Sequence, residues 1–162
     1  MPNELLLVLS LLFAFGGLLA SFRLFGKPGL YSWTVFATIA ANIEVLILVR
    51  AFGLEQTLGN TLFASSFLAT DILSECYGKK SANKAVYIGL ATSAAFIILT
   101  VMWMQYTPSQ NDWAFTSIKT IFSNTPRVMT ASLAGYAVSE LFDVWAYHKR
   151  KMHQKMGGVK RD

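Results

Sequence analysis

Hydrophobic residues fall in five long runs along the chain, and short polar stretches separate these runs. Each run is close to the roughly 20 residues that an α-helix needs to cross the hydrocarbon layer of a membrane. Helices are expected because lipid offers no partner for open backbone groups. The predicted transmembrane helices are Leu5–Leu24, Leu30–Val49, Leu58–Glu75, Ala85–Tyr106 and Arg127–Tyr147. We therefore expect an all-α, polytopic transmembrane helix bundle with about five transmembrane helices.

Two segments need a closer look. The first apolar run is preceded by Met1-Pro2-Asn3-Glu4, which lacks the positive charge of a signal peptide, so we expect a retained helix. The longest outer loop precedes the last run, and in it Asp112 is placed to cap a short helix that ends at Phe122. Its apolar residues would share one face, as in a helix that lies on the membrane or covers an entrance.

Composition supports lipid as the solvent. Hydrophobic residues make up 54% of the chain and charged residues 14%, well below the roughly 25% charged residues of soluble domains. The net charge of the chain is +5, and most basic residues lie in short stretches beside the apolar runs. This distribution is typical of the cytoplasmic loops of membrane proteins and does not indicate nucleic-acid binding. An outside N-terminus would place eleven basic residues inside and only Arg50, Lys119 and Arg127 outside. We expect that orientation, with residues 1–148 as the transmembrane domain and 149–162 as a cytoplasmic basic tail.

The sequence lacks the residue patterns that are typical of several functions. Cys76 is the single cysteine, so no internal disulfide is expected. His148 and His153 lie five residues apart in the basic tail, which is the wrong spacing for metal ligands on one helix face, and no metal is expected. The chain has no nucleotide-binding glycine loop and no recognisable nucleophile with a base. We expect no enzyme activity, no cofactor and no nucleic-acid partner.

Small residues recur at four-residue spacing on two predicted helices. Ala131, Gly135 and Ser139 share one face of the last helix, and Gly17 and Ser21 share a face of the first. Faces of this kind allow helices to approach closely in lipid. The sequence therefore predicts close helix packing along both faces, and a homo-oligomer remains an open alternative.

Charged residues inside the apolar runs carry the functional signal. A charge at the centre of a bilayer costs at least about 2.5–3.5 kcal/mol, so such residues usually face a cavity, a partner or a pathway. Glu44 lies near the middle of the second helix, and Asn42 falls on a different face from it. Asn60 is at the start of the third helix.

Four further acidic residues form two pairs. Asp71 and Glu75 are four apart and share one face of the third helix, and Glu140 and Asp143 are three apart and share one face of the fifth. If these faces meet, the four acids cannot all stay ionised in a low dielectric unless positive groups join them. They would form a site for a cationic or donor-rich ligand or a proton relay. The alternative is that Glu75 and Asp143 lie at the water boundary and pair with nearby lysines.

Two long blocks resemble one known family. The block Phe67–Lys80 reads FLATDILSECYGKK, and Pro126–His148 reads PRVMTASLAGYAVSELFDVWAYH. Together with Gly53–Asn60, they resemble the queuosine precursor transporter family, also called vitamin uptake transporters. Members of that family continue past the equivalent of Asp162 into further helices, so the resemblance implies that this chain holds only part of the family's bundle.

The resemblance implies an integral inner-membrane, multi-pass importer of deazaguanine bases that works by secondary transport. Its substrates would be cyano- or aminomethyl-deazaguanine, whose donor-rich edge suits carboxylates and whose planar ring suits aromatic side chains. The alternatives are a substrate-binding membrane subunit that needs a separate ATPase, and a membrane scaffold protein. Arg127 begins the fifth helix. It would either anchor this helix at the membrane interface or contact the substrate at the entrance. The candidate substrate-binding residues are Asn42, Glu44, Asn60, Asp71, Glu75, Tyr77, Arg127, Glu140 and Asp143.

Overall fold

The computed structural model describes residues 2–123 and 125–158, with side chains described over 2–123 and 127–150. In this part of the chain five helices and one β-hairpin follow each other in a mainly helical fold, which confirms the predicted all-α class apart from the hairpin. The side chains of Thr125 and Pro126, directly before the last predicted helix, and of the tail residue His153 fall outside the described side chains. Residues 159–162 of the predicted basic tail lie outside the described residues.

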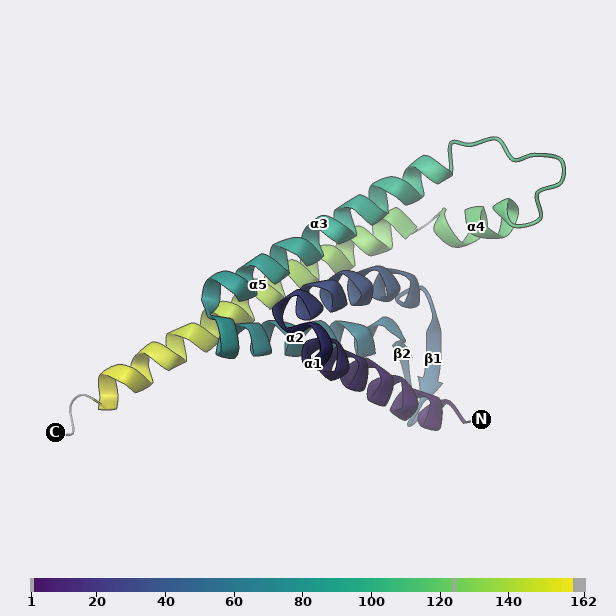
Figure 1. Cartoon of the computed structure of the whole chain (residues 1–162). Helices are drawn as coiled ribbons and strands as arrows, with labels where there is room; N and C mark the ends of the chain where they lie inside the picture. Colours follow the sequence, from purple (N-terminus) through teal and green to yellow (C-terminus); the bar gives the residue numbers. More distant parts are fainter. Residues whose placement is uncertain (1, 124, 159–162) are drawn as a thin grey trace.

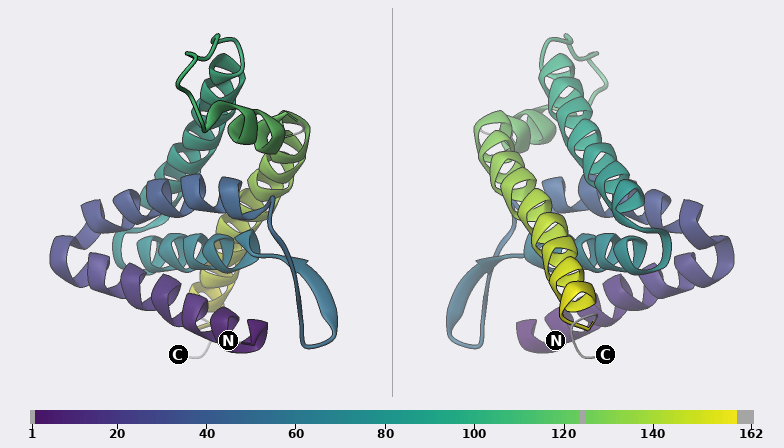
Figure 2. Two further views of the ribbon diagram at one scale, coloured as in Figure 1. Left: turned by 90° about the vertical axis from the view of Figure 1, so that its right-hand side faces the viewer. Right: turned by 90° about the vertical axis from the view of Figure 1, so that its left-hand side faces the viewer.

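The helix α1 (Asn3–Glu44) is bent into two halves that run back along each other (Figure 2). The bend is at Gly26, whose φ of 61° and ψ of −136° are open mainly to glycine, and Pro28 follows two residues later. These halves correspond to the first two predicted transmembrane helices. The second half ends at Glu44 rather than at the predicted Val49.

Small residues allow the two halves of α1 to touch. A Cβ at Gly29 would overlap the carbonyl oxygen of Ser21, and the Ser21 hydroxyl donates to the Gly29 carbonyl over 3.0 Å. A Cβ at Gly17 would lie 2.5 Å from the Trp33 ring. The small-residue face predicted for the first helix is thus confirmed as a close packing surface.

A β-hairpin replaces the predicted end of the second helix. Strands β1 (Leu48–Ala51) and β2 (Leu54–Thr57) pair antiparallel across a turn at Phe52 and Gly53, whose φ values of 52° and 76° are typical of a tight hairpin turn. The β-branched and apolar residues before the turn favour extended backbone, which the hydropathy pattern alone did not reveal. The hairpin is tied to the start of α1, because Asn3 donates to the Arg50 carbonyl over 2.9 Å.

The remaining helices follow the prediction with shifted ends. The helix α2 (Gly59–Tyr77) meets α3 (Lys79–Trp103) at Gly78, where φ is 79°. Next come the short α4 (Phe115–Phe122) and α5 (Thr125–Gly158), which remains helical past the expected boundary at residue 148.

The short outer helix was predicted correctly. The Asp112 carboxylate accepts hydrogen bonds from the N–H groups of Ala114 and Phe115, at 2.9 and 2.6 Å. At the other end of α4, the Phe122 ring packs edge-on against Phe96 and Trp103 on α3. A carboxylate thus begins α4 and an aromatic contact secures its end.

The helix ends gather at two opposite poles of an elongated molecule (Figure 1). One pole, here the hairpin pole, holds the N-terminus, the β-hairpin and α4. The other, the bend pole, holds the α1 bend, the α2–α3 turn and the C-terminal end of α5. Successive helical segments therefore run between the poles in alternating directions, as a polytopic bundle requires.

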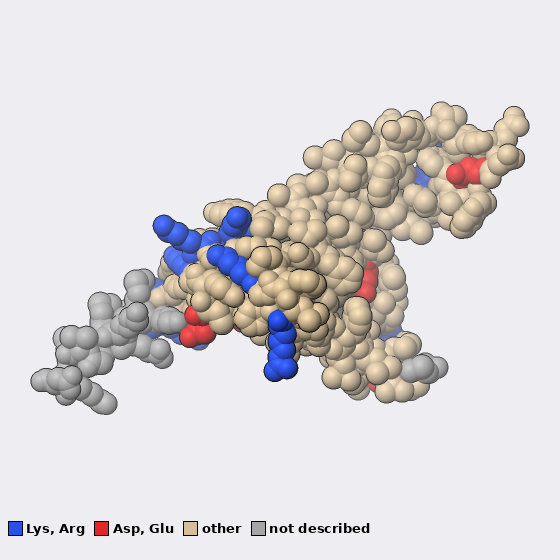
Figure 3. All heavy atoms as spheres, viewed as in Figure 1, with Lys and Arg blue, Asp and Glu red and all other residues tan. Residues whose placement is uncertain are grey.

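The core and the outer surface are both apolar. A buried cluster centred on Leu18, Leu30, Leu73 and Val86 joins α1, α2 and α3. Large apolar side chains such as Leu12 and Val138 are exposed on the outside. On the face in Figure 3, lysines and arginines gather near the bend pole, and long stretches of surface carry no charge. Among the described helices, α1 and α3 are long and apolar enough to cross a membrane, with mean hydropathies of 2.5 and 2.1.

Candidate functional site

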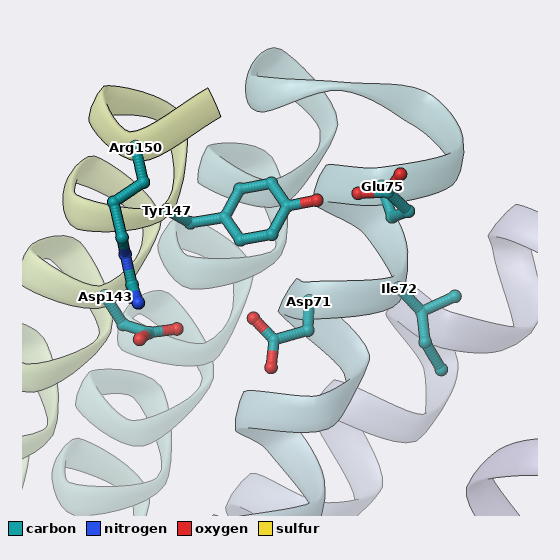
Figure 4. Close-up of a pocket in the computed structure, with 6 residues that line it drawn as sticks. All are labelled: Asp71, Ile72, Glu75, Asp143, Tyr147 and Arg150. Carbon is teal, nitrogen blue, oxygen red and sulfur yellow. The ribbon is translucent and has the colours of Figure 1, made fainter. Parts of the chain in front are cut away.

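A pocket of about 450 Å³ opens between α2 and α5 near the bend pole. It is lined by Asp71, Ile72, Glu75, Asp143, Tyr147 and Arg150 (Figure 4). We call it the acidic pocket. It contains three of the four acids whose convergence the sequence predicted.

The acidic pocket is built from one polar stripe on each helix. Asp71 and Glu75 are one turn apart on α2, and Asp143, Tyr147 and Arg150 follow each other at spacings of four and three on α5. Asp71 and Asp143 face each other across the gap and interact directly (Figure 4). Arg150 reaches toward Asp143 from two turns further along α5, so a positive group joins the acids.

The fourth acid, Glu140, lies beside this pocket and is fully buried, with 0% of its surface exposed. The Ser66 and Thr70 hydroxyls of α2 lie 3.2 and 3.0 Å from its two carboxylate oxygens and donate to them. These hydroxyls compensate for much of the cost of burying a carboxyl group. Glu140 thereby joins α5 to α2.

Tyr136 is one turn before Glu140 on α5 and is also buried. Its ring packs against Phe63 and Phe67, with centroid distances of 5.4 and 6.3 Å. A Cβ at Gly89 would lie 2.8 Å from the Tyr136 hydroxyl oxygen, so a larger residue there would require the Tyr136 side chain to shift. Within the described part of the chain this hydroxyl has no hydrogen-bond partner of good geometry, although it interacts electrostatically with Glu140.

Asn42 and Glu44 lie on different faces of α1, as predicted. Asn42 is buried and donates to the Thr38 carbonyl over 2.8 Å and to the Ser93 hydroxyl over 2.9 Å. Its contacts join α1 to α3. Glu44 instead lines a separate pocket of about 310 Å³ between both halves of α1 and the start of α2, with Ser10 and Thr61 among its neighbours.

Three further candidate residues lie away from the acidic pocket. Asn60 is exposed at the start of α2, where its side-chain oxygen accepts from the Thr57 hydroxyl over 3.4 Å. Tyr77 turns toward Phe22 at the bend pole. Arg127 is exposed near the start of α5, beside an open pocket of about 470 Å³.

The small-residue face predicted on α5 has no partner in the described structure. A Cβ at Gly135 would meet nothing within 4 Å, and Ala131 and Ser139 are exposed. The prediction of close packing at this face is therefore wrong for the described residues. The buried face of α5 instead carries Met129, Tyr136, Glu140 and Val144.

Sequence reasoning missed five residues that the structure places around the acids. They are Ser66, Thr70, Tyr136, Tyr147 and Arg150. One signal was available, because Ser66 and Thr70 are four apart and lie on one face of α2. Arg150 was counted only as part of the basic tail, since a continuous helix to Gly158 was not expected.

Comparison with known proteins adds independent information. The family model described as "putative vitamin uptake transporter" matches residues 57–160. The chain is 40% identical over 123 residues to a "probable queuosine precursor transporter" of Bacillus subtilis, an alignment that covers 76% of this chain and 54% of the relative. The chain thus spans about half the length of the curated relative that it matches. No solved structure matches it.

The family match covers α2, α3, α4 and α5 in full, and it includes the acidic pocket and Glu140. It also agrees with the two long apolar helices and with the resemblance of Phe67–Lys80 and Pro126–His148. These observations identify a membrane protein. The chain belongs to the putative vitamin uptake transporter family.

Proposed function

We propose that this chain forms a substrate-binding part of a secondary transporter that imports deazaguanine precursors of queuosine. The observation that carries the proposal is the pair of facing carboxylates, Asp71 and Asp143, in an open pocket between α2 and α5. A pocket of about 450 Å³ is within the usual size range for small-molecule sites.

The pocket's chemistry suits a guanine-like base. The edge of such a base carries adjacent N–H donors, which a carboxylate accepts as a bidentate pair. A second carboxylate opposite would accept the ammonium of an aminomethyl group, and the Tyr147 ring offers an aromatic surface. Arg150 would offset part of the negative charge that the three acids bring to the empty site.

Glu140 is placed to link this pocket to the bundle. It lies one turn from Asp143 on α5 and accepts hydrogen bonds from α2. Alternating access needs two helices whose relative position changes around the substrate. We propose that the α2–α5 contact is such a joint, with Glu140 as its central polar contact.

The proposed setting is the inner membrane, with the hairpin pole outside and the bend pole in the cytoplasm. Among the residues that the structure describes, nine basic residues belong to the segments near the bend pole and three to those near the hairpin pole. This asymmetry supports the orientation through the positive-inside rule. The chain would then cross the membrane five times, with residues 149–162 on the cytoplasmic side.

An import assay tests the function. The full gene would be expressed in cells that cannot make queuosine precursors, and queuosine in tRNA would be measured after feeding at low external precursor. Asp71→Asn and Asp143→Asn should each reduce incorporation at least about ten-fold, since each removes a charge-assisted contact. Glu55→Gln, on the exposed hairpin, is the matched control and should retain activity.

The same variants separate the rival functions. Wild-type incorporation in both pocket variants at normal abundance would overturn the proposed site. An absence of rescue by the wild-type gene would overturn import and favour a scaffold. Uptake by the purified protein in liposomes without any ATPase would exclude the alternative that this chain is a substrate-binding subunit that needs a separate ATPase. An absence of uptake there, restored by a co-purified ATPase, would favour it.

A further inference from the structure

Two lysines and two tyrosines from three helices meet at the bend pole. The Lys27 Nζ atom lies 5.4 Å from the Tyr77 ring centroid and 5.9 Å from the Tyr31 centroid. The Lys84 Nζ atom lies 5.7 Å from the Tyr31 centroid. We call Lys27, Tyr31, Tyr77 and Lys84 the lysine–tyrosine cluster. It brings two ammonium groups close to the Tyr31 ring.

The fold holds this cluster in place. The Tyr31 hydroxyl donates to the Ser81 carbonyl over 3.3 Å, which joins the second half of α1 to the first turn of α3. The Tyr77 ring packs edge-on against Phe22, with a centroid distance of 6.5 Å. Lys27 comes directly after Gly26, where the bend in α1 turns the chain toward α2. The lysine side chains therefore have part of their conformational freedom removed before any ligand arrives.

The segments around the cluster carry an excess of positive charge. Residues 23–31 and 77–84 contain five basic residues and no acidic one, namely Arg23, Lys27, Lys79, Lys80 and Lys84. Figure 3 shows basic side chains gathered near this pole. Such a density of like charge on adjacent elements favours an anionic partner.

Apolar surface adjoins these charges. Leu24 and Phe25 are 74% and 67% exposed at the bend, and Tyr87 is exposed close to one turn after Lys84 on α3. A surface that combines ammonium groups and tyrosine rings with neighbouring exposed apolar side chains matches a phospholipid, which carries a phosphate group and acyl chains. A free anion would gain nothing from the apolar part.

We propose that the lysine–tyrosine cluster is a binding site for the phosphate headgroup of an anionic phospholipid. Lys27 and Lys84 would donate to the headgroup phosphate, and Leu24 and Phe25 would contact the acyl chains. The site joins α1, α2 and α3, so an occupied site would hold the α1 bend against the α2–α3 turn. The inference rests on the proposed placement of the bend pole at the cytoplasmic leaflet.

Native mass spectrometry of the purified chain in detergent tests the site directly. Phosphatidylglycerol would be titrated against phosphatidylcholine of the same acyl chains. The wild-type chain should bind phosphatidylglycerol more tightly, and Lys27→Gln/Lys84→Gln should lose roughly five-fold in affinity for each lysine. Lys27→Arg/Lys84→Arg should retain binding. Lys119→Gln/Arg127→Gln, which removes two charges near the hairpin pole, is the matched control and should bind like the wild type.

Three outcomes would overturn the proposal. The first is equal affinity for the two lipids. The second is an unchanged preference in the Lys27→Gln/Lys84→Gln variant, which would indicate general attraction to the surface. The third is displacement of the lipid by inorganic phosphate at comparable concentration, which would indicate a site for a free anion.

The lipid experiment is independent of the transport proposal. Lipid binding is measured on purified protein without substrate, so it can fail while the import assay succeeds. Asp71→Asn should abolish import and leave phosphatidylglycerol binding unchanged, because Asp71 lines the acidic pocket and not the cluster.

Discussion

The Thr70 hydroxyl of α2 donates a 3.0 Å hydrogen bond to the carboxylate of Glu140 on α5, in a position closed to solvent. The same hydroxyl lies 2.8 Å from the Phe67 carbonyl one turn back. One proton can serve only one of these two acceptors at a time. The Thr70 hydroxyl can therefore bond either within α2 or across to α5, and only the second choice satisfies the buried carboxylate of Glu140.

Removing the Thr70 hydroxyl should destabilise the protein. Thr70→Val keeps the shape but leaves a buried carboxylate oxygen with one donor fewer, at a cost of about 1–3 kcal/mol. The measurement is thermal unfolding of the purified chain in detergent. Thr57→Val, on the hairpin, is the control and should change the melting temperature little. Equal melting temperatures for both variants would contradict the importance of the Thr70–Glu140 contact.

Gly29 and Gly135 should respond in opposite ways to alanine. Gly29→Ala places a methyl group against the Ser21 carbonyl, so the halves of α1 must separate, at a cost of about 1–3 kcal/mol or more. Gly135→Ala meets nothing within 4 Å and adds helix propensity, so it should be neutral or stabilising. Thermal unfolding and expression level measure both effects. A stable Gly29→Ala variant would disprove the close contact at the α1 bend.

Arg150 and Asp143 should be energetically coupled in transport. Arg150→Gln leaves facing acids in the pocket without their nearby positive charge, and Asp143→Asn removes one of those acids. The two changes together should cost less than the sum of their single effects on uptake, by about 0.5–3 kcal/mol in a double-mutant cycle. Strict additivity would mean that the two groups act independently. The control cycle combines Lys119→Gln with Asp143→Asn, and the effects of these two changes should be additive.

The single cysteine reports the orientation of the bundle. Cys76 is exposed near the end of α2, next to the α2–α3 turn. A membrane-impermeant maleimide should label it only after the cells are permeabilised, because we place the bend pole inside. Cys76→Ser combined with Ser109→Cys, in the exposed loop between α3 and α4, should give the reverse pattern. Labelling of Cys76 in intact cells would reverse the proposed orientation.

The local pattern predicted some features of the site and missed others. The spacing of Asp71 and Glu75, and of Glu140 and Asp143, placed each pair on one helix face, because helix periodicity is a local property. This spacing did not indicate that Glu140 would be buried beside two hydroxyl groups, or that Asp143 would line an open pocket. That difference depends on the rotation of α5 against α2, which many distant contacts set together.

The sequence alone determined a helical membrane protein, its apolar segments, the capped outer helix and the family. Each of these depends on composition or on residues within one or two turns. Only the tertiary structure decided that the two halves of α1 fold back on each other across Gly26, that Asp71 meets Asp143, and that Lys27 and Lys84 approach the same tyrosine. It also showed the Gly135 face without a neighbour. The physical reason is that helix pairing in an apolar bundle is chosen by close side-chain fit, and the periodicity of a single helix carries no information about its partner.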